Sequence, residues 1–463
     1  MNKYIVGLDI GTTKIACFIG EQAANGKIRI AGIGKTESVG VEHGVVRNVR
    51  SAADSIRKAV ADASEMAKYD VEEVYVGIAG QHIKSQANQG SIMIPESHRL
   101  IEQADVDQLI ENQYRVLLAP GEEIIHVFPQ SYIVDNEPLG PDIPPVGVAG
   151  KCLAANFHIV TGNIVNLRNI RDAVQAAGLR VKDVVLEPIA SAYAVLDDGD
   201  KNAGVALVDI GGGTTDIAIF HEGIIRHTSV LPLAGKVITN DIRESCKILQ
   251  HQAESLKVRF GSCMPTSVNQ DDIISIPGIR NQAPREISVK TLAGIIKSRM
   301  QLILEQVGYE IQLSGFERQL IAGVVLTGGG ANLKNIREFS EFITGIDSRI
   351  GTPDEHIDKE NSIDFEDLRH PMYATGVGLV IYGLLEEKNI QQQERSRTKE
   401  SEPDIVPTAL GEAETEDAVE EDVKKKSPKQ SRKKSSSGKD GSHWIDAVAA
   451  WASNLFSDEG LDE

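Results

Sequence analysis

Two segments of the chain share one pattern, in which an apolar run ends in Asp and Ile, passes through a turn of Gly and Thr, and continues into a second apolar run. They read "YIVGLDIGTTKIACFIG" at residues 4–20 and "GVALVDIGGGTTDIAIF" at residues 204–220. A pattern repeated at this separation is typical of a duplicated fold. We therefore predict two related halves that face one another, each opening with a strand, a turn and a second strand.

The residue types of the two turns suit an anion. Glycine permits positive φ and lets backbone N–H groups approach a ligand, and threonine adds hydroxyl donors. The predicted phosphate-contacting residues are Gly11, Thr12, Thr13, Gly211, Gly212, Gly213, Thr214 and Thr215. Asp9 and Asp209, each at the end of its strand, would hold Mg²⁺ through its water shell, because Mg²⁺ usually keeps several waters. Two tight hairpins closed by Asp are the alternative.

A third glycine turn follows another apolar run in "AGVVLTGGGANLKNI", residues 322–336. Gly328, Gly329 and Gly330 would let an adenine and its ribose lie against bare backbone, and Asn332 is predicted to begin a helix. A simple strand-to-helix turn is the alternative.

Composition limits the classes of function. The 463 residues carry a net charge of -19, which argues against nucleic acid as the main partner. Short β-branched runs alternate with amphipathic helical patterns up to about residue 388, which predicts an α/β architecture. The four cysteines have no metal-binding spacing. Because the chain shows neither a secretory signal nor an apolar stretch long enough to span a membrane, we expect it in the cytoplasm.

The C-terminal part differs in composition. Residues 389–441 form an acidic and then a basic block, which is predicted to be a disordered linker. Residues 442–456, within "SHWIDAVAAWASNLFSDEG", gather their apolar side chains in one arc of a helix, which predicts an amphipathic membrane-binding segment. The residues of that arc are Trp444, Ile445, Val448, Trp451, Leu455 and Phe456. Docking of this helix on the protein's own core or on a partner is the alternative.

Three glycine turns in this order resemble the superfamily of actin, the heat-shock chaperone ATPases and the sugar kinases. The phosphate 1, phosphate 2 and adenosine motifs of that superfamily match residues 6–20, 205–220 and 321–336, and its two connecting helices match residues 186–195 and 370–383. The resemblance implies a duplicated actin-like, ribonuclease H-like fold, with two lobes that close on ATP and Mg²⁺.

The resemblance also implies roles for single residues. Lys14 would reach the β- or γ-phosphate, Glu187 would lie near the attacking water, and Asp216 would orient phosphate or metal-bound water. Gly235, Glu254 and Lys257 match positions near ribose and adenine. An ordinary surface ion pair between Glu254 and Lys257 is the alternative.

Within the superfamily the chain is most similar to FtsA, the bacterial actin homologues that tether the division ring to the membrane. The likeness rests on an inserted subdomain at residues 84–162 after the third strand, on an upper subdomain at 236–320, and on the C-terminal helix. It implies filaments of the protein with itself, slow ATP hydrolysis at most, and a location at the septum, on the cytoplasmic face of the membrane. It further implies binding of the FtsZ C-terminal tail near Arg299, of later division proteins by the inserted subdomain, and of an anionic membrane surface.

The expected division of the chain follows from these matches. The first lobe comprises residues 1–83, 163–198 and 365–388, and the second comprises 199–235 and 321–364, with the upper subdomain 236–320 attached to it. Two alternatives stay open, a PilM-like ATP-binding scaffold and a small-metabolite kinase of the same superfamily.

Overall fold

The computed structural model describes residues 3–94, 100–140, 143–269, 271–278 and 283–400. Residues 1–385 form one compact unit, and the following description concerns that unit unless stated.

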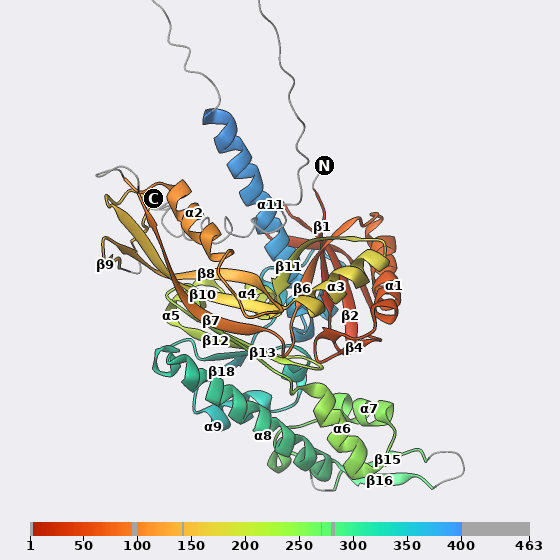
Figure 1. The fold of residues 1–463 in the computed structure, drawn as a ribbon. Coiled ribbons are helices and arrows are strands. Elements are labelled where there is room, and N and C mark those ends of the chain that lie inside the picture. The colour runs from red at the N-terminus through yellow and green to blue at the C-terminus, as the bar shows by residue number, and fades with distance from the viewer. Residues whose placement is uncertain (1–2, 95–99, 141–142, 270, 279–282, 401–463) are drawn as a thin grey trace, which may run out of the picture. The chain divides into compact units, whose positions relative to one another are not determined.

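The first lobe contains a mixed sheet in the order β11-β6-β1-β2-β3 (Figure 1). Its strands are β1 (Ile5–Ile10), β2 (Lys14–Gln22), β3 (Ile28–Glu37), β6 (Glu73–Ile78) and β11 (Arg180–Leu186). β1, β2 and β3 are antiparallel neighbours, whereas β6 is parallel to β1 and β11. Helices α1 (Val49–Ala67) and α3 (Ile164–Ala176) pack on this sheet and bury the apolar side chains of the lobe between them.

Strand β3 is the element that the sequence analysis did not separate. Its two glycines, Gly32 and Gly34, interrupt the β-branched pattern that predicts a strand. The structure shows why glycine is needed there: a Cβ on Gly32 would collide with the backbone of α1 at Ala63, and a Cβ on Gly34 would collide with it at Ala59. The inserted subdomain begins after β6, the strand with the sequence "EVYVGI". The inserted subdomain was expected after the third strand. Because β3 precedes β6 in the chain, the subdomain instead follows the fourth described strand of this sheet in chain order.

The second lobe repeats the arrangement, in the order β14-β13-β12-β17-β18. Its strands are β12 (Val205–Ile210), β13 (Thr215–His221), β14 (Ile224–Leu231), β17 (Val324–Thr327) and β18 (Ser348–Ile350). As in the first lobe, three neighbouring strands, β12, β13 and β14, are antiparallel, and the sheet continues on the other side of β12 with the parallel strands β17 and β18. This agreement confirms the predicted duplication. Helix α9 (Ile336–Thr344) lies between β17 and β18 in sequence.

Two further groups of elements extend the lobes. The inserted part comprises β7 (Lys84–Met93), α2 (Gln103–Gln113), β8 (Glu122–Val134), β9 (Glu137–Pro138) and β10 (Cys152–Asn163), with the sheet order β7-β10-β8-β9. It contacts β14, where Ser85 Oγ donates to Thr228 O at 3.2 Å. The other group comprises α6 (Gly235–Cys246), α7 (Gln250–Phe260), β15 (Ile273–Ile276), β16 (Arg285–Ser288) and α8 (Val289–Ser314), which lie together at the lower end of Figure 1.

Two helices connect the lobes, α4 (Glu187–Val195) and α11 (Ala374–Glu400). They cross closely because Gly378 has no side chain, and a Cβ there would collide with the carbonyl group of Ala190. The small residues at this point, Gly378 and Ala190, therefore permit the crossing. The described chain also contains the short elements β4 (Val41–Glu42), β5 (Val45–Val46), α5 (Asp198–Ala203) and α10 (Phe365–Leu368), and several single turns of 3₁₀ helix.

The expected start of the linker at residue 389 needs correction, because α11 continues to Glu400. The segment "NIQQQERSRTKE" is polar, but Gln, Glu, Arg and Lys favour helices and no Gly or Pro interrupts them. None of the described helices has the length and the apolar composition needed to cross a membrane.

Candidate functional site

The two predicted phosphate turns meet in the structure. Strands β1 and β2 pair up to Ile10 and Ile15, and β12 and β13 pair up to Ile210 and Thr215, so each turn is the tip of a hairpin. A Cβ on Gly212 would lie 2.5 Å from Thr13 Oγ1, and a Cβ on Gly213 would collide with Thr12. Glycine is thus required in the second turn for the hydroxyl groups of the first to approach it.

A contact that the sequence analysis missed ties the turns together. The short hairpin β4–β5 places His43 and Gly44 at its tip, both with positive φ. Gly44 N donates to Thr12 Oγ1 at 3.0 Å, and His43 Nδ1 lies 3.2 Å from the carbonyl oxygen of Gly213. Two adjacent residues of the first lobe therefore contact both turns. The sequence indicates this hairpin only by the pair His43-Gly44 within "VEHGVV", residues 41–46.

The carboxylates come from both lobes. Asp209 and Asp216 are cross-strand partners in β12 and β13, and Asp9 occupies in β1 the position that Asp209 occupies in β12. Asp209 Oδ2 accepts hydrogen bonds from Ser191 Oγ at 2.7 Å and from Thr375 Oγ1 at 3.1 Å. These two hydroxyls belong to the two connecting helices, so the helices that join the lobes also orient Asp209.

Asp216 is buried in a different way. Its Oδ2 accepts from Thr214 Oγ1 at 2.8 Å, whereas its Oδ1 is buried without a hydrogen-bond partner among the described residues. A buried oxygen without a partner is costly unless a ligand, a metal ion or its water satisfies it. This oxygen is the observation in the structure that best fits a bound Mg²⁺ with its water shell.

Burial raises the pKa of all these carboxyl groups. It raises the pKa of Asp9 to about 6, although Lys14 opposes the rise. Burial and then the negative charge of Asp9 hold the pKa of Glu187 well above its usual range, and burial and then Asp209 do the same for Asp216. The pKa of Asp209 is also raised by burial, against the hydrogen bonds from Ser191 and Thr375. Such a cluster of carboxylates is stabilised by a cation.

The positively charged side chain beside Asp9 and Asp209 is that of Lys14. Its Nζ donates to Met372 O at 2.6 Å and lies 4.4 Å from the centroid of the Tyr373 ring. Burial lowers the pKa of Lys14, and the charges of Asp9 and Asp209 oppose that change. The amino group therefore lies near both aspartates, at the base of the first turn.

The third glycine turn adjoins the second. Thr327 at the end of β17 pairs with Asp209 in β12, and Gly328 follows with φ +81°. A Cβ on Gly330 would collide with Ile210. Gly329 to Asn332 form one turn of 3₁₀ helix and α9 begins only at Ile336, so the prediction that Asn332 begins the helix is wrong. Asn332 instead donates from Nδ2 to Gly329 O at 3.4 Å and closes the turn.

The residues predicted near ribose and adenine also lie beside the second turn. Gly235 N donates to Gly211 O at 3.1 Å at the start of α6. Lys257 Nζ donates to Gly235 O at 3.0 Å, to Thr239 Oγ1 at 2.9 Å and to Glu254 Oε2 at 2.9 Å. The side chain of Lys257 is 13% exposed and that of Glu254 is 48% exposed, so the pair lies at the protein surface with the lysine facing inward.

Arg299 is paired within the protein. Its Nε and Nη2 donate to the two carboxylate oxygens of Asp241 at 2.6 and 3.0 Å, which joins α8 to α6. Arg299 is therefore not a freely solvated side chain. The predicted membrane-binding residues Trp444, Ile445, Val448, Trp451, Leu455 and Phe456 lie outside the described residues.

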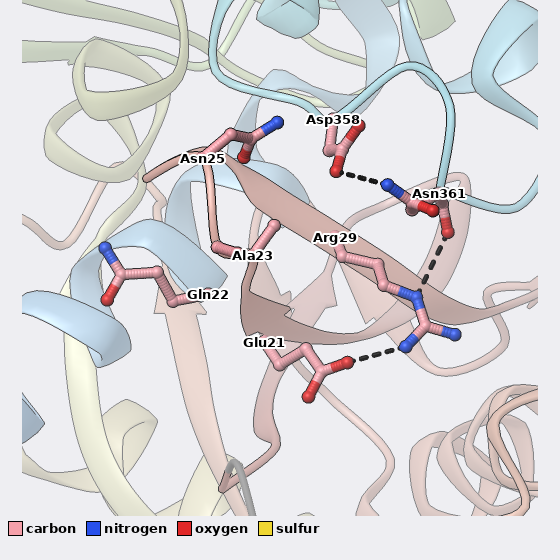
Figure 2. A pocket seen from close by; sticks show the side chains of 8 residues that line it. Glu21, Gln22, Ala23, Asn25, Arg29, Asp358 and Asn361 are labelled. Carbon is pink, nitrogen blue, oxygen red and sulfur yellow. Dashed lines mark hydrogen bonds and ion pairs between the residues drawn. The ribbon is translucent and has the colours of Figure 1, made fainter.

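Within the described ranges, no three His, Cys, Asp or Glu side chains are arranged to hold a metal ion directly. A pocket of about 410 Å³ lies elsewhere, between the β2–β3 hairpin and the loop around Asp358 (Figure 2). Its Arg29 is already paired with Glu21 at 2.7 Å, and none of the predicted site residues lines it.

Comparison with known proteins decides the family. The chain is 38% identical to cell division protein FtsA of Pseudomonas aeruginosa over 382 residues, which are 82% of this chain and 89% of the relative. The chain belongs to the FtsA family of cell division proteins. FtsA of Neisseria meningitidis is 37% identical over 86% of this chain and 95% of its own length, and FtsA of Escherichia coli is 34% identical over 82% and 90%.

Family profiles agree with the FtsA assignment. The profile of cell division protein FtsA matches residues 206–378, and that of the SHS2 domain inserted in FtsA matches residues 80–161. Hsp70 protein matches residues 165–229. Among solved structures, a PilM-PilN type IV pilus biogenesis complex is similar with a TM-score of 0.59 and 16% identity, covering 83% of this chain and 99% of that chain. MreB5 of Spiroplasma citri bound to ADP has a TM-score of 0.50 at 16% identity, covering 84% and 98%. These neighbours confirm the actin-like fold expected for FtsA.

Proposed function

We propose that this FtsA-family protein binds ATP with Mg²⁺ between its two phosphate turns. The observation that carries the proposal is the convergence, from both lobes, of two glycine-threonine turns and four interacting acidic side chains, with Lys14 beside Asp9 and Asp209. The ADP in the similar MreB5 structure supports the nucleotide class. The third turn, with Gly328 to Gly330, would receive the adenosine.

Each residue has a separate task in this proposal. The backbone N–H groups and hydroxyls of the turns bind phosphate oxygens, and Lys14 neutralises part of their charge. Asp9 and Asp209 hold the water shell of Mg²⁺, which when bound shields the phosphates and the carboxylates from one another. Asp216 contributes its unpartnered oxygen to the same shell, and Gly235, Glu254 and Lys257 form the wall beside the second turn.

The same residues explain why hydrolysis would be slow at most. Glu187 begins α4 against β6, where a Cβ on Gly77 would lie only 3.1 Å from the Glu187 side chain. Burial and three neighbouring carboxylates hold the pKa of Glu187 well above its usual range. A proton on this carboxyl group would prevent it from accepting one from the attacking water, which fits the slow hydrolysis at most that the family resemblance implies.

We place the protein at the division septum, on the cytoplasmic face of the cell membrane, as a peripheral protein that polymerises and connects FtsZ to the membrane. Family membership supports this role. In this account residues 442–456 bind an anionic membrane surface, the region around Arg299 binds the C-terminal tail of FtsZ, and the inserted subdomain binds later division proteins. The lobe and subdomain boundaries predicted from the sequence belong to the same proposal.

Electron microscopy of the full chain on anionic lipid monolayers, with and without Mg-ATP, tests this function. We expect ordered filaments on the lipid when Mg-ATP is present. A PilM-like scaffold would bind nucleotide without forming lipid-bound filaments, and a kinase would consume ATP when glycerol-like or hexose acceptors are added. Either of those outcomes would replace the proposed function.

A further inference from the structure

One short segment contacts all three glycine turns. This return segment, residues 371–375, enters α11 after the chain has left β18. Its hydrogen bonds are Gly328 N and Thr327 Oγ1 to Pro371 O, both 3.2 Å, Lys14 Nζ to Met372 O at 2.6 Å, and Thr375 Oγ1 to Asp209 Oδ2 at 3.1 Å. Tyr373 is the residue of the segment whose side chain faces Lys14.

The ring of Tyr373 is buried and is held by contacts at its edge and at its hydroxyl group. It is 2% exposed, and its edge packs on Phe18 with ring centroids 5.8 Å apart. Its hydroxyl accepts from Lys35 Nζ at 2.9 Å and donates to Asp367 Oδ2 at 3.1 Å, while Lys35 and Asp367 pair with each other at 2.9 Å. A ring held by so many contacts presents its face to Lys14 Nζ in one orientation, with the nitrogen 4.4 Å from the centroid.

We propose that Tyr373 is a positioning residue for Lys14, which holds the lysine ammonium over its ring at the base of the first phosphate turn, while Lys35 and Asp367 fix the ring. The proposal rests on the proposed function, in which that turn binds the polyphosphate of a nucleotide.

The electrostatics of the site indicate what the contact between Lys14 and Tyr373 would do for phosphate binding. Burial favours the neutral amine of Lys14, and a neutral amine would not attract phosphate. The negative face of an aromatic ring attracts a cation, so Tyr373 favours the charged form and limits its direction. Tyr373 makes this contact from the connecting segment, so the lysine of the first turn is tied to the segment that also contacts the second and third turns.

Chemical labelling of lysines in the full chain reads the contact directly, without nucleotide. The rate at which an amine-reactive ester modifies Lys14 is followed by mass spectrometry between pH 6 and 11, with the exposed Lys58 of α1 as internal control. We expect Tyr373→Phe to raise the rate by less than twofold near pH 8, because the ring face remains and only its hydroxyl contacts are lost. Tyr373→Leu should make Lys14 react at least threefold faster near pH 8, and an unchanged profile would overturn the proposal.

Affinity for Mg-ATP provides a double-mutant cycle. We expect Tyr373→Leu to weaken binding about tenfold and Tyr373→Phe less than twofold. In a Lys14→Gln background, Tyr373→Leu should add less than a twofold loss, because its target is gone. The same tenfold loss in that background would mean that Tyr373 acts only through packing, and would overturn the proposal.

Two controls keep the outcomes distinct. If Tyr373→Leu does not fold by circular dichroism, Asp367→Ala removes the acceptor of the ring hydroxyl at a half-exposed position, and it should raise the labelling rate of Lys14 by a smaller factor; no rise there would overturn the positioning role. If the wild type binds no Mg-ATP, the proposed function fails, while the labelling profiles still decide the contact between Lys14 and Tyr373.

Discussion

Asp209 and Asp216 lie directly opposite each other in the antiparallel pair β12–β13, and both are almost fully buried. Side chains at such positions project from the same face of the sheet, and like charges there destabilise the fold. The protein therefore carries a destabilising pair at the point where its second phosphate turn begins. A local conflict of this kind is typical of a functional site, and it leads to the first prediction.

Asp216→Asn should stabilise the protein at neutral pH while weakening Mg-ATP binding. A carboxyl group whose pKa is raised in the folded state contributes stability at low pH and loses it as pH rises through that raised pKa. The amide has no charge to bury and can still accept from Thr214, so we expect a gain within about 0.5 to 3 kcal/mol at pH 7.5 that disappears below pH 4. Urea unfolding at both pH values measures it, with the exposed Asp62→Asn as control. An equal or lower stability at pH 7.5 would contradict this reading.

His158→Gln should reduce the sensitivity of the fold to acid. His158 Nε2 lies 3.0 Å from Thr228 Oγ1, where the inserted part contacts β14. Burial, and then the charge of His227, lowers the pKa of His158 to about 4. A histidine with a lowered pKa supports the fold above its usual value of 6.5 and loses that support as pH falls toward 4, by at most about 3 kcal/mol.

Glutamine can keep the hydrogen bond to Thr228 and does not titrate. Unfolding midpoints at pH 7.5 and 4.5 should therefore differ less in His158→Gln than in the wild type, whereas the exposed His251→Gln should behave like the wild type. Identical acid losses in all three proteins would remove His158 as the cause.

Arg299→Glu should weaken binding of an FtsZ tail peptide and leave Mg-ATP affinity unchanged. The bidentate pair with Asp241 leaves only 29% and 28% of the two side chains exposed, and the substitution places a second carboxylate beside Asp241, so some loss of stability is expected and circular dichroism must first show that the variant is folded. Asp241→Asn is the matched variant, because it removes the charge that pairs with the guanidinium and leaves Arg299 in place. Fluorescence anisotropy should show weaker binding for Arg299→Glu and equal or tighter binding for Asp241→Asn. Equal peptide affinity in all three proteins would exclude Arg299 from the contact.

Trp451→Glu should release the protein from anionic liposomes. The predicted helix 442–456 gains affinity from its apolar arc at about 25 cal/mol per Å² of buried apolar area, and a charge within the arc removes that gain. Ser453→Glu places the same charge on the opposite, polar side and should bind nearly as the wild type does. Flotation separates bound from free protein; a Trp451→Glu variant that still floats with the liposomes would exclude this helix as the anchor.

The sequence predicted the parts of the site that repeat or that need glycine. The two turns, Asp9 and Asp209 follow from a local pattern, and the repeat itself predicts that the lobes are related. Ser191, Thr375 and Tyr373 could not be predicted in this way, because each reaches the site from a connecting helix or from the segment before it, far away in sequence. His43 was missed because the hairpin that carries it has only two residues in each strand.

The start of the linker was predicted too early in the chain. Polar composition predicted disorder from residue 389, yet helix propensity carries α11 to Glu400. Composition reports how little apolar surface a segment can bury, but it does not report whether a helix that began in a packed region continues.

The most direct test of the account is isothermal titration calorimetry of Mg-ATP with the wild type and with Asp209→Ala. Asp209 connects the second turn, both connecting helices and the proposed Mg²⁺ shell, so its removal should weaken Mg-ATP binding by at least about tenfold. Binding measured in excess chelator should differ much less between the two proteins, because the carboxylate acts through the metal. Equal Mg-ATP affinity in the two proteins would contradict the proposed nucleotide site.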